Sequence, residues 1–108
     1  MSIDLSSKSQ KYIIKNNVQN ILIDVTFFEE SCAEIYDPSI LILKTKDLEK
    51  FKDLDIISNG NLTLYISKDF IKVFGKLENY QLDTNGIFRN KLFLSNVDPI
   101  IKDTCRTN

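Results

Sequence analysis

The stretch from residue 55 to residue 66, D-I-I-S-N-G-N-L-T-L-Y-I, decides the fold class. Asn59-Gly60 lies between two short runs rich in Ile, Leu and Tyr, which are residue types enriched in strands. Asn-Gly accepts positive φ at both central positions of a type I′ turn, whose twist matches that of two paired strands. This stretch therefore predicts a β-hairpin.

The same signal recurs further along the chain. Asn85-Gly86 lies between residues 80–83 and residues 87–94, so a second hairpin is predicted there. Gly75 marks either another turn or a bulge.

Toward the N-terminus, residues 18–28 alternate with the period of a long strand. Its predicted core face carries Ile21, Ile23, Val25 and Phe27. Residues 40–43 are apolar on both faces, which is the pattern of a buried strand.

Between these strands, residues 29–37 are expected to be irregular, and Asp37-Pro38 is expected to mark a break. The charged residues 44–53 fit either one helical turn or a wrapped loop.

The N-terminal segment combines a short strand with a helix. Residues 2–5 alternate and predict an edge strand, and Ser6 or Ser7 offers a hydroxyl that can cap a helix. The helix should place Tyr12, Ile13 and Ile14 inward and end at Asn16-Asn17, because Asn tolerates the left-handed conformation.

These elements predict a mainly β (α+β) fold: twisted mixed or antiparallel sheets with two Asn-Gly hairpins and one early helix. We expect a single domain over residues 1–97 and a C-terminal tail over 98–108, without an internal repeat. The residues expected to be mostly buried are Ile23, Val25, Ile42, Leu64, Ile66 and Leu92.

Composition narrows the function classes. The 108 residues carry 14 basic and 15 acidic side chains, so the basic footprint of a nucleic-acid-binding protein is missing. The longest apolar run, residues 40–43, is far shorter than the roughly 20 residues of a membrane-spanning helix. Residues 1–5 lack the pattern of a secretory signal, which predicts a cytoplasmic protein with Cys32 and Cys105 as free thiols rather than a disulfide.

The residue types also limit the chemistry. The chain contains no histidine, which excludes His-based triads and imidazole ligands. Cys32 has Glu29, Glu30 and Glu34 as neighbours, and negative charges disfavour a reactive thiolate. A catalytic role is therefore not expected.

A metal site is the remaining chemical interpretation. Cys32 could act with nearby carboxylates, and Cys105 could supply a second thiolate from the same fold or from another subunit. The spacing has no Cys-x-x-Cys, so it does not specify the metal; iron or an iron–sulfur cluster is one candidate.

Several short segments occur together in a recognisable order across roughly residues 1–97. They are Ile21–Val25, Ser31-Cys32, Asp37–Ile40, Lys46–Glu49, Leu64–Lys68, Leu82-Asp83 and Phe93. With these segments the chain resembles the HesB-like family, the relatives of A-type iron–sulfur carriers. Within it the chain is most similar to the small branch named for a Cys-Cys or Cys-selenocysteine motif.

The resemblance implies twisted mixed sheets with an early helix, and thiol-centred chemistry at Ser31-Cys32. The sequence departs from the family pattern at two places. Serine occupies the first position of the motif, and Cys105 stands alone where A-type carriers end in Cys-x-Cys.

Three hypotheses follow. The first is a non-enzymatic HesB-like domain with residual thiol-based iron–sulfur or metal binding through Cys32 and Cys105. The second is a small interaction module without metal, whose exposed β-edge or apolar face binds a protein partner or a second copy of the chain. The third is a redox-active thiol protein.

Overall fold

The structure is a computed structural model that describes residues 1–85 and 91–104. Its fold is mainly β with mixed sheets, as predicted. In chain order the elements are β1 (Ser2–Leu5), α1 (Ser7–Lys15), β2 (Asn20–Glu30), β3 (Ala33–Leu43), the 3₁₀ helix η1 (Thr45–Phe51), β4 (Asp55–Asn59), β5 (Leu62–Ile66), α2 (Lys68–Phe74), β6 (Asn79–Asn85), β7 (Lys91–Leu94) and β8 (Ile100–Asp103).

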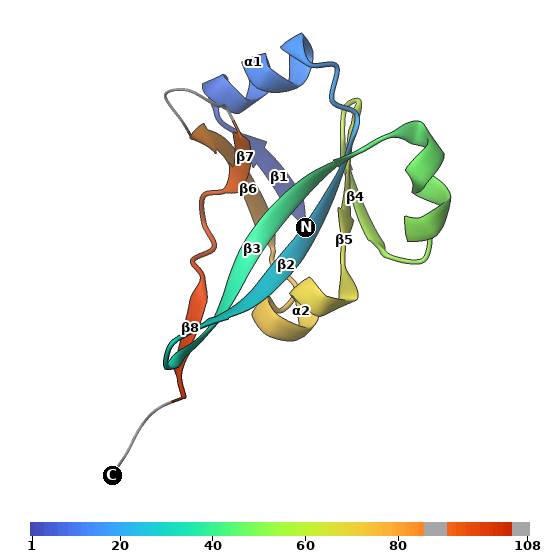
Figure 1. Cartoon of the computed structure of the whole chain (residues 1–108). Helices are drawn as coiled ribbons and strands as arrows, with labels where there is room; N and C mark the ends of the chain where they lie inside the picture. Colours follow the sequence, from blue (N-terminus) through green and yellow to red (C-terminus); the bar gives the residue numbers. More distant parts are fainter. Residues whose placement is uncertain (86–90, 105–108) are drawn as a thin grey trace.

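The strands form two sheets (Figure 1). The smaller has the order β1-β6-β7 and the larger β4-β5-β2-β3-β8. Each sheet contains one parallel pair, β1 with β6 and β2 with β5, and the other neighbours are antiparallel. β8 lies within the segment predicted as a tail, so part of that segment belongs to the larger sheet.

The main core collects apolar side chains from both sheets and from α2. Four of the six predicted core residues are buried: Ile23, Leu64, Ile66 and Leu92. Val25 is only half-buried, and the prediction for Ile42 is wrong, because 43% of this residue is exposed. β8 pairs only with residues Ala33–Tyr36 of β3, so at Ile42 β3 is the open edge of the sheet.

A second, smaller cluster covers the opposite face of the larger sheet. Leu22, Leu43 and Tyr65 are buried there under apolar side chains of η1 and the residues that follow it. The charged segment 44–53 therefore forms a short 3₁₀ helix that wraps the sheet, in agreement with the predicted turn or loop.

The first predicted hairpin is present as β4 and β5. Asn59 pairs with Leu62, so the central turn residues are Gly60 and Asn61, one position later than expected. Only Gly60 of these two has positive φ, which is the pattern of a type II′ turn. For the second hairpin, β6 pairs antiparallel with β7, whereas the predicted turn at Asn85-Gly86 extends outside the described residues.

The predicted irregular stretch 29–37 is in fact regular. β2 and β3 are 11 residues each and are joined at Ser31-Cys32, with φ of 46° at Ser31. The predicted break at Asp37-Pro38 is also wrong, because Pro38 pairs with Val25 inside β3. β8 does not extend to Pro38, and proline is tolerated where a strand is an edge.

Helix α2 was missed in the sequence. Ile71 and Val73 are β-branched and favour strands, but Ser67 caps the helix by accepting a hydrogen bond from the Phe70 backbone N–H. Phe70 is fully buried, and Gly75 ends the helix at a φ of 83°, so this glycine terminates a helix and not a strand. Burial of one face thus overrides the local preference.

Helix α1 agrees better with prediction. Ser6 caps it and Asn16 ends it, and the following Asn17 has positive φ. Tyr12 and Ile13 are half-buried, whereas Ile14 is 80% exposed, so its predicted inward orientation is wrong.

The order of elements shows an internal repeat that the sequence did not reveal. The unit β1–α1–β2–β3 is followed, after η1 and β4, by the unit β5–α2–β6–β7. In each unit a strand leads through a serine cap into a helix and then into an antiparallel hairpin. The single strand of each unit pairs in parallel with the hairpin of the other, so both sheets contain strands of both units.

Matching side-chain contacts support the repeat. Ser6 donates to Asp83 Oδ1 at 2.6 Å, and Ser67 donates to Asp24 Oδ1 at 2.7 Å. Each aspartate oxygen also accepts from the next backbone N–H at 2.8 Å, from Thr84 or Val25. Each serine is the helix cap, so a Ser–Asp contact ties each helix start to the neighbouring parallel strand. We call these two contacts the Ser–Asp clasps.

Candidate functional site

Cys32 lies in the turn between β2 and β3 and is exposed. Its carbonyl oxygen accepts a 2.7 Å hydrogen bond from the Thr104 backbone N–H, just beyond the pair formed by Ala33 and Asp103. Cys32 is disulfide-bonded, so the expectation of a free thiol at this position is wrong. The chain's other cysteine, Cys105, lies outside the described residues.

The acidic residues beside Cys32 lie at the ends of β2 and β3. Glu29 and Glu34 are cross-strand partners, and Glu34 also lies opposite Lys102 of β8. Within residues 1–85 and 91–104, no group of three or more Cys, Asp or Glu side chains could hold a metal ion. The described part of the predicted Cys32 site is thus a charged hairpin end.

The outer parts of β2 and β3, together with β8, project from the body of the domain (Figure 1). We call this three-stranded segment, residues 27–30, 33–36 and 100–103, the arm. Its pairing places Phe27, Tyr36 and Ile100 on one face and Phe28, Ile35 and Ile101 on the other. The arm therefore carries apolar side chains on both faces, next to charged ones, although it lies outside both core clusters.

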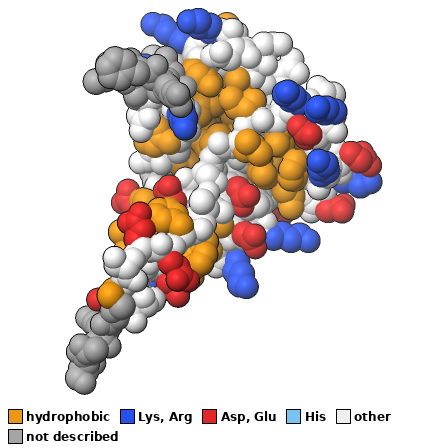
Figure 2. All heavy atoms as spheres, viewed as in Figure 1, with side chains coloured by type: hydrophobic (Ala, Val, Ile, Leu, Met, Phe, Trp, Pro, Cys, Tyr) orange, Lys and Arg blue, Asp and Glu red, His pale blue; other side chains and the backbone are white. Residues whose placement is uncertain are grey.

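Many of these apolar side chains remain accessible. Phe27 is 49% exposed and Ile101 is 67% exposed. Figure 2 shows hydrophobic side chains beside acidic ones along the arm. Exposed apolar side chains that lie together usually mark a place where another molecule binds.

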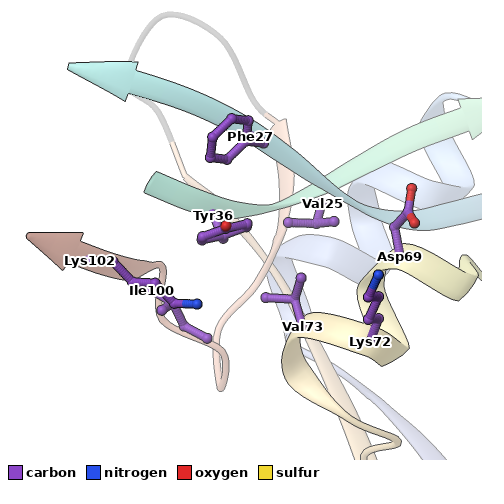
Figure 3. A pocket seen from close by; sticks show the side chains of 8 residues that line it. All are labelled: Val25, Phe27, Tyr36, Asp69, Lys72, Val73, Ile100 and Lys102. Atoms are coloured by element: carbon purple, nitrogen blue, oxygen red, sulfur yellow. The ribbon is translucent and has the colours of Figure 1, made fainter. Parts of the chain in front are cut away.

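On the face that carries Phe27, a hollow of about 530 Å³ lies between the arm and α2 (Figure 3). We call it the arm pocket. It is lined by Val25, Phe27, Tyr36, Asp69, Lys72, Val73, Ile100 and Lys102. In Figure 3 the Val73 side chain points from α2 toward Val25 of β2, and the Lys102 side chain lies beside Ile100 and Tyr36.

One wall of the arm pocket is aromatic. The ring centroids of Phe27 and Tyr36 are 5.0 Å apart at an interplanar angle of 41°. Lys102 Nζ lies 5.2 Å from the centroid of the Tyr36 ring, within the range of a cation–π interaction. This contact holds a positive charge at the aromatic end of the pocket.

A second positive charge comes from Lys72 on α2. The ion pairs among the described residues are Lys52–Glu49 and Lys76–Asp55, so neither Lys72 nor Lys102 is in an ion pair. Asp69, one turn before Lys72, is the single acidic side chain among the described residues that line the pocket. These described lining residues thus supply two ammonium groups and one carboxylate.

A smaller hollow of about 390 Å³ lies between β3 and the segment that follows β7. Among the described residues that line it, the charged ones are Asp37 and Asp98, both acidic. It offers less apolar wall than the arm pocket, so the arm pocket is the better candidate for a binding site.

Two described side chains have displaced pKa values, and neither lines the arm pocket. Burial in the core raises the pKa of Tyr80. The hydrogen bond from Ser6, followed by that from the Thr84 backbone, lowers the pKa of Asp83. Both pKa shifts arise from the packing of the fold. The shift of Tyr80 arises in the core, and the shift of Asp83 arises in a Ser–Asp clasp.

Sequence reasoning missed most of the arm pocket, because its residues were assigned to other elements. The sequence pattern predicts Val25 and Phe27 in the core, Tyr36 in an irregular stretch, and Ile100 and Lys102 in a tail. One signal was available in the length of the strand. Eleven residues at ~3.3 Å each extend roughly 36 Å, further than the core of a chain this small.

Comparison of the chain with protein-family models, with curated proteins and with solved structures finds no match. Among the described residues, no helix is both long and apolar enough to cross a membrane.

Proposed function

We propose that this chain is a non-enzymatic binding domain and that the arm pocket is its binding site. The observation that carries the proposal is the pocket itself, an accessible hollow of about 530 Å³ with apolar and aromatic walls and a few charged groups. Small-molecule sites typically measure about 300–1,000 Å³ and have this mixture of lining residues.

The position of the pocket supports the same conclusion. Apolar side chains at the protein surface cost free energy unless a partner covers them, at roughly 25 cal/mol per Å² of apolar area. Phe27 lines the pocket and is about half exposed, although Ile21 and Ile23 on the same face of its strand are fully buried. A bound molecule would cover this ring.

The test is a nuclear magnetic resonance titration of the whole chain with small apolar probes such as toluene and phenylacetamide. Amide shifts should change for arm-pocket residues and stay constant around Asp98 in the smaller hollow. A Val73→Asp variant, which places a charge on the apolar wall, should lose the response, whereas Lys50→Met on η1 should keep it. Shift changes scattered over the surface would contradict the proposal.

The face of the arm that does not line the arm pocket favours a second candidate function, which is the binding of a protein partner or of a second copy of the chain. Phe28 and Ile101 are exposed on this face, and β8 is the last strand in the order of the larger sheet. Edge strands with apolar neighbours are common pairing sites. Sedimentation across a concentration series tests self-association, and Ile101→Lys should abolish any dimer that forms through β8.

HesB-like ancestry and metal or cluster binding by Cys32 and Cys105 stay a prediction from the resemblance. A thiolate is the metal ligand, so the disulfide at Cys32 would first have to be reduced. Anaerobic reconstitution of the reduced chain with iron and sulfide, read by absorption and metal analysis, tests it. Equal iron content in Cys32→Ser and the unsubstituted chain would contradict the prediction.

Because Cys32 is exposed, reductants can reach its disulfide, and the redox-active alternative can be tested by measuring the reduction potential of this disulfide. Structural disulfides have potentials below about −300 mV, and exposed catalytic or regulatory ones lie higher. Equilibration with glutathione buffers gives this potential directly, and a value below −300 mV would exclude a redox role in the glutathione range.

A further inference from the structure

We propose that the arm pocket binds a small carboxylate whose body is aromatic or branched aliphatic. This inference rests on the proposed binding function and adds the chemical class of the ligand. It is carried by the combination of apolar walls with two lysines that come from different elements.

The walls select the body of the ligand. Val25, Val73 and Ile100 form an aliphatic surface, and the paired rings of Phe27 and Tyr36 form an aromatic one. A flat or branched apolar group would contact both surfaces and remove Phe27 from water. Aromatic rings contribute offset-stacked or edge-to-face contacts in addition to the buried area.

The lysines select the charge. Lys72 is on α2 and Lys102 is on β8, so they approach the pocket from two sides, and neither is in an ion pair among the described residues. Among the described lining residues, with Asp69 counted, there are two positive charges and one negative charge; Glu34, which lies opposite Lys102 in the β3–β8 pair, is not one of them. A ligand with one negative charge is therefore complementary, whereas an amine would face excess positive charge.

Asp69 does not cancel this preference. It lies in the first turn of α2, where backbone N–H groups without helical partners already favour a negative charge. Lys102 in turn is held beside the Tyr36 ring by the cation–π contact, so its ammonium group stays at the pocket wall. A carboxylate at that wall would gain charge-assisted hydrogen bonds.

The test uses three probes with the same aromatic body: phenylacetate, phenylacetamide and phenethylamine. Calorimetric or resonance titration of the whole chain should give phenylacetate an affinity about tenfold higher than phenylacetamide, because only the carboxylate forms ion pairs with the lysines. Phenethylamine should bind most weakly. Raising the salt concentration to 0.5 M should narrow the difference, since accessible charges are screened.

Matched variants assign the effect to the lysines. Lys72→Met and Lys102→Met keep an aliphatic stem and remove the charge, so each should weaken phenylacetate binding severalfold more than it weakens phenylacetamide binding. Lys50→Met on η1 serves as the control and should change neither affinity. Both pocket lysines are exposed, so the fold should survive these substitutions.

The outcomes separate this inference from the proposed function. If phenylacetate and phenylacetamide bind equally well in the pocket, the carboxylate preference is overturned and the binding function stands. If phenethylamine binds best, the charge assignment is reversed and the inference fails. If no probe, charged or neutral, perturbs the arm-pocket residues, both the inference and the proposed function fail.

Discussion

At the scale of single residues, the clearest result is the division of β2 into a buried half and an exposed half. Ile21 and Ile23 are fully buried, Val25 is half-buried and Phe27 is half exposed, although all four lie on one face of the strand. Alternation in a sequence identifies the face of a strand. It does not say where along the strand the covering layer ends, because that depends on distant elements such as α2 and β8.

The core assignment can be measured with two isoleucines. Ile23→Ala should lower the free energy of unfolding by about 2–5 kcal/mol, because it removes buried methyl groups and leaves a cavity. Ile42→Ala deletes the same atoms at a 43% exposed position and should cost about 1 kcal/mol or less. Urea denaturation of both variants provides the comparison, and equal losses would contradict the division of the core.

The Ser–Asp clasp at Asp83 makes stability depend on pH. The pKa of Asp83 in the folded chain is lower than the unfolded reference of 3.8, because the Ser6 hydroxyl and the Thr84 backbone N–H stabilise the carboxylate. The resulting stabilisation is fully present above pH 3.8 and is lost as the pH falls through the lower, folded-state value. Asp83→Asn should thus be less stable than the unsubstituted chain at neutral pH.

The difference in stability between Asp83→Asn and the unsubstituted chain should become smaller below about pH 4, where the carboxylate of the unfolded chain takes up a proton. Urea midpoints between pH 7 and pH 3 give the curve. Asp53→Asn is the control, since Asp53 is exposed and its carboxylate makes no hydrogen bond or ion pair within residues 1–85 and 91–104. A difference for Asp83→Asn that stays constant over the whole range would show that the charge is not stabilised in the fold.

At the scale of elements, strong local sequence signals predict their elements correctly, whereas elements that depend on tertiary context do not follow from the sequence. Ser6 and Asn16-Asn17 bound α1 as predicted, and Asn59-Gly60 lies at the first hairpin. α2 was missed because its β-branched residues favour a strand, and burial of Phe70 decides otherwise. β8 was missed because its pairing depends entirely on β3, a partner more than 60 residues earlier in the chain.

β8 should also be the least stable strand of the larger sheet. It is held by four residue pairs to β3, and three of its four residues are exposed. The Cys32 disulfide is at the end of the hairpin to which β8 is attached, where Thr104 still bonds to the Cys32 carbonyl. Loss of this crosslink should raise the rate at which β8 opens locally.

Cys32→Ser should therefore increase amide hydrogen exchange in residues 100–104 by an order of magnitude or more, consistent with the ~2–4 kcal/mol that crosslinks typically contribute. Exchange in β5, which lies in the main core, should change far less. The same variant should weaken phenylacetate binding, because Ile100 and Lys102 line the arm pocket. Unchanged exchange in β8 would show that backbone pairing alone holds the strand.

At the scale of the whole molecule, the mixed sheets predicted from the sequence arise from the exchange of strands between two similar units. The sequence hides this repeat, because the units share few residue identities beyond an apolar–Ser pair at 5–6 and 66–67 and an apolar–Asp pair at 23–24 and 82–83. These short dipeptides can be recognised as equivalent positions of the two units only because β1 lies beside β6 and β5 beside β2 in the sheets. Topology, unlike helix caps and turns, is not a local property of the chain.

Strand exchange makes each unit incomplete on its own. A chain cut between the exposed residues Lys52 and Asp53 gives fragments 1–52 and 53–108, each with half of every parallel pair. Each fragment alone should be largely unfolded, and an equimolar mixture should regain β structure and a cooperative thermal transition. Circular dichroism measures both. A fragment 1–52 that folds alone with native-like resonances would contradict this account.

The clasp between Ser6 and Asp83 joins residues 77 positions apart, and this has a consequence for synthesis on the ribosome. β1 and α1 leave the ribosomal tunnel before β6, and the strand that pairs with β1 is made only after β2, β3, β4, β5 and α2. Forming such a long-range contact closes a long loop of the chain. The conformational entropy lost in this closure is not offset by local contacts, and this slows folding. Until β6 emerges, the nascent chain exposes the unpaired edge of β1 and the inner faces of β2 and β3, so the cell must keep these segments from associating with other chains.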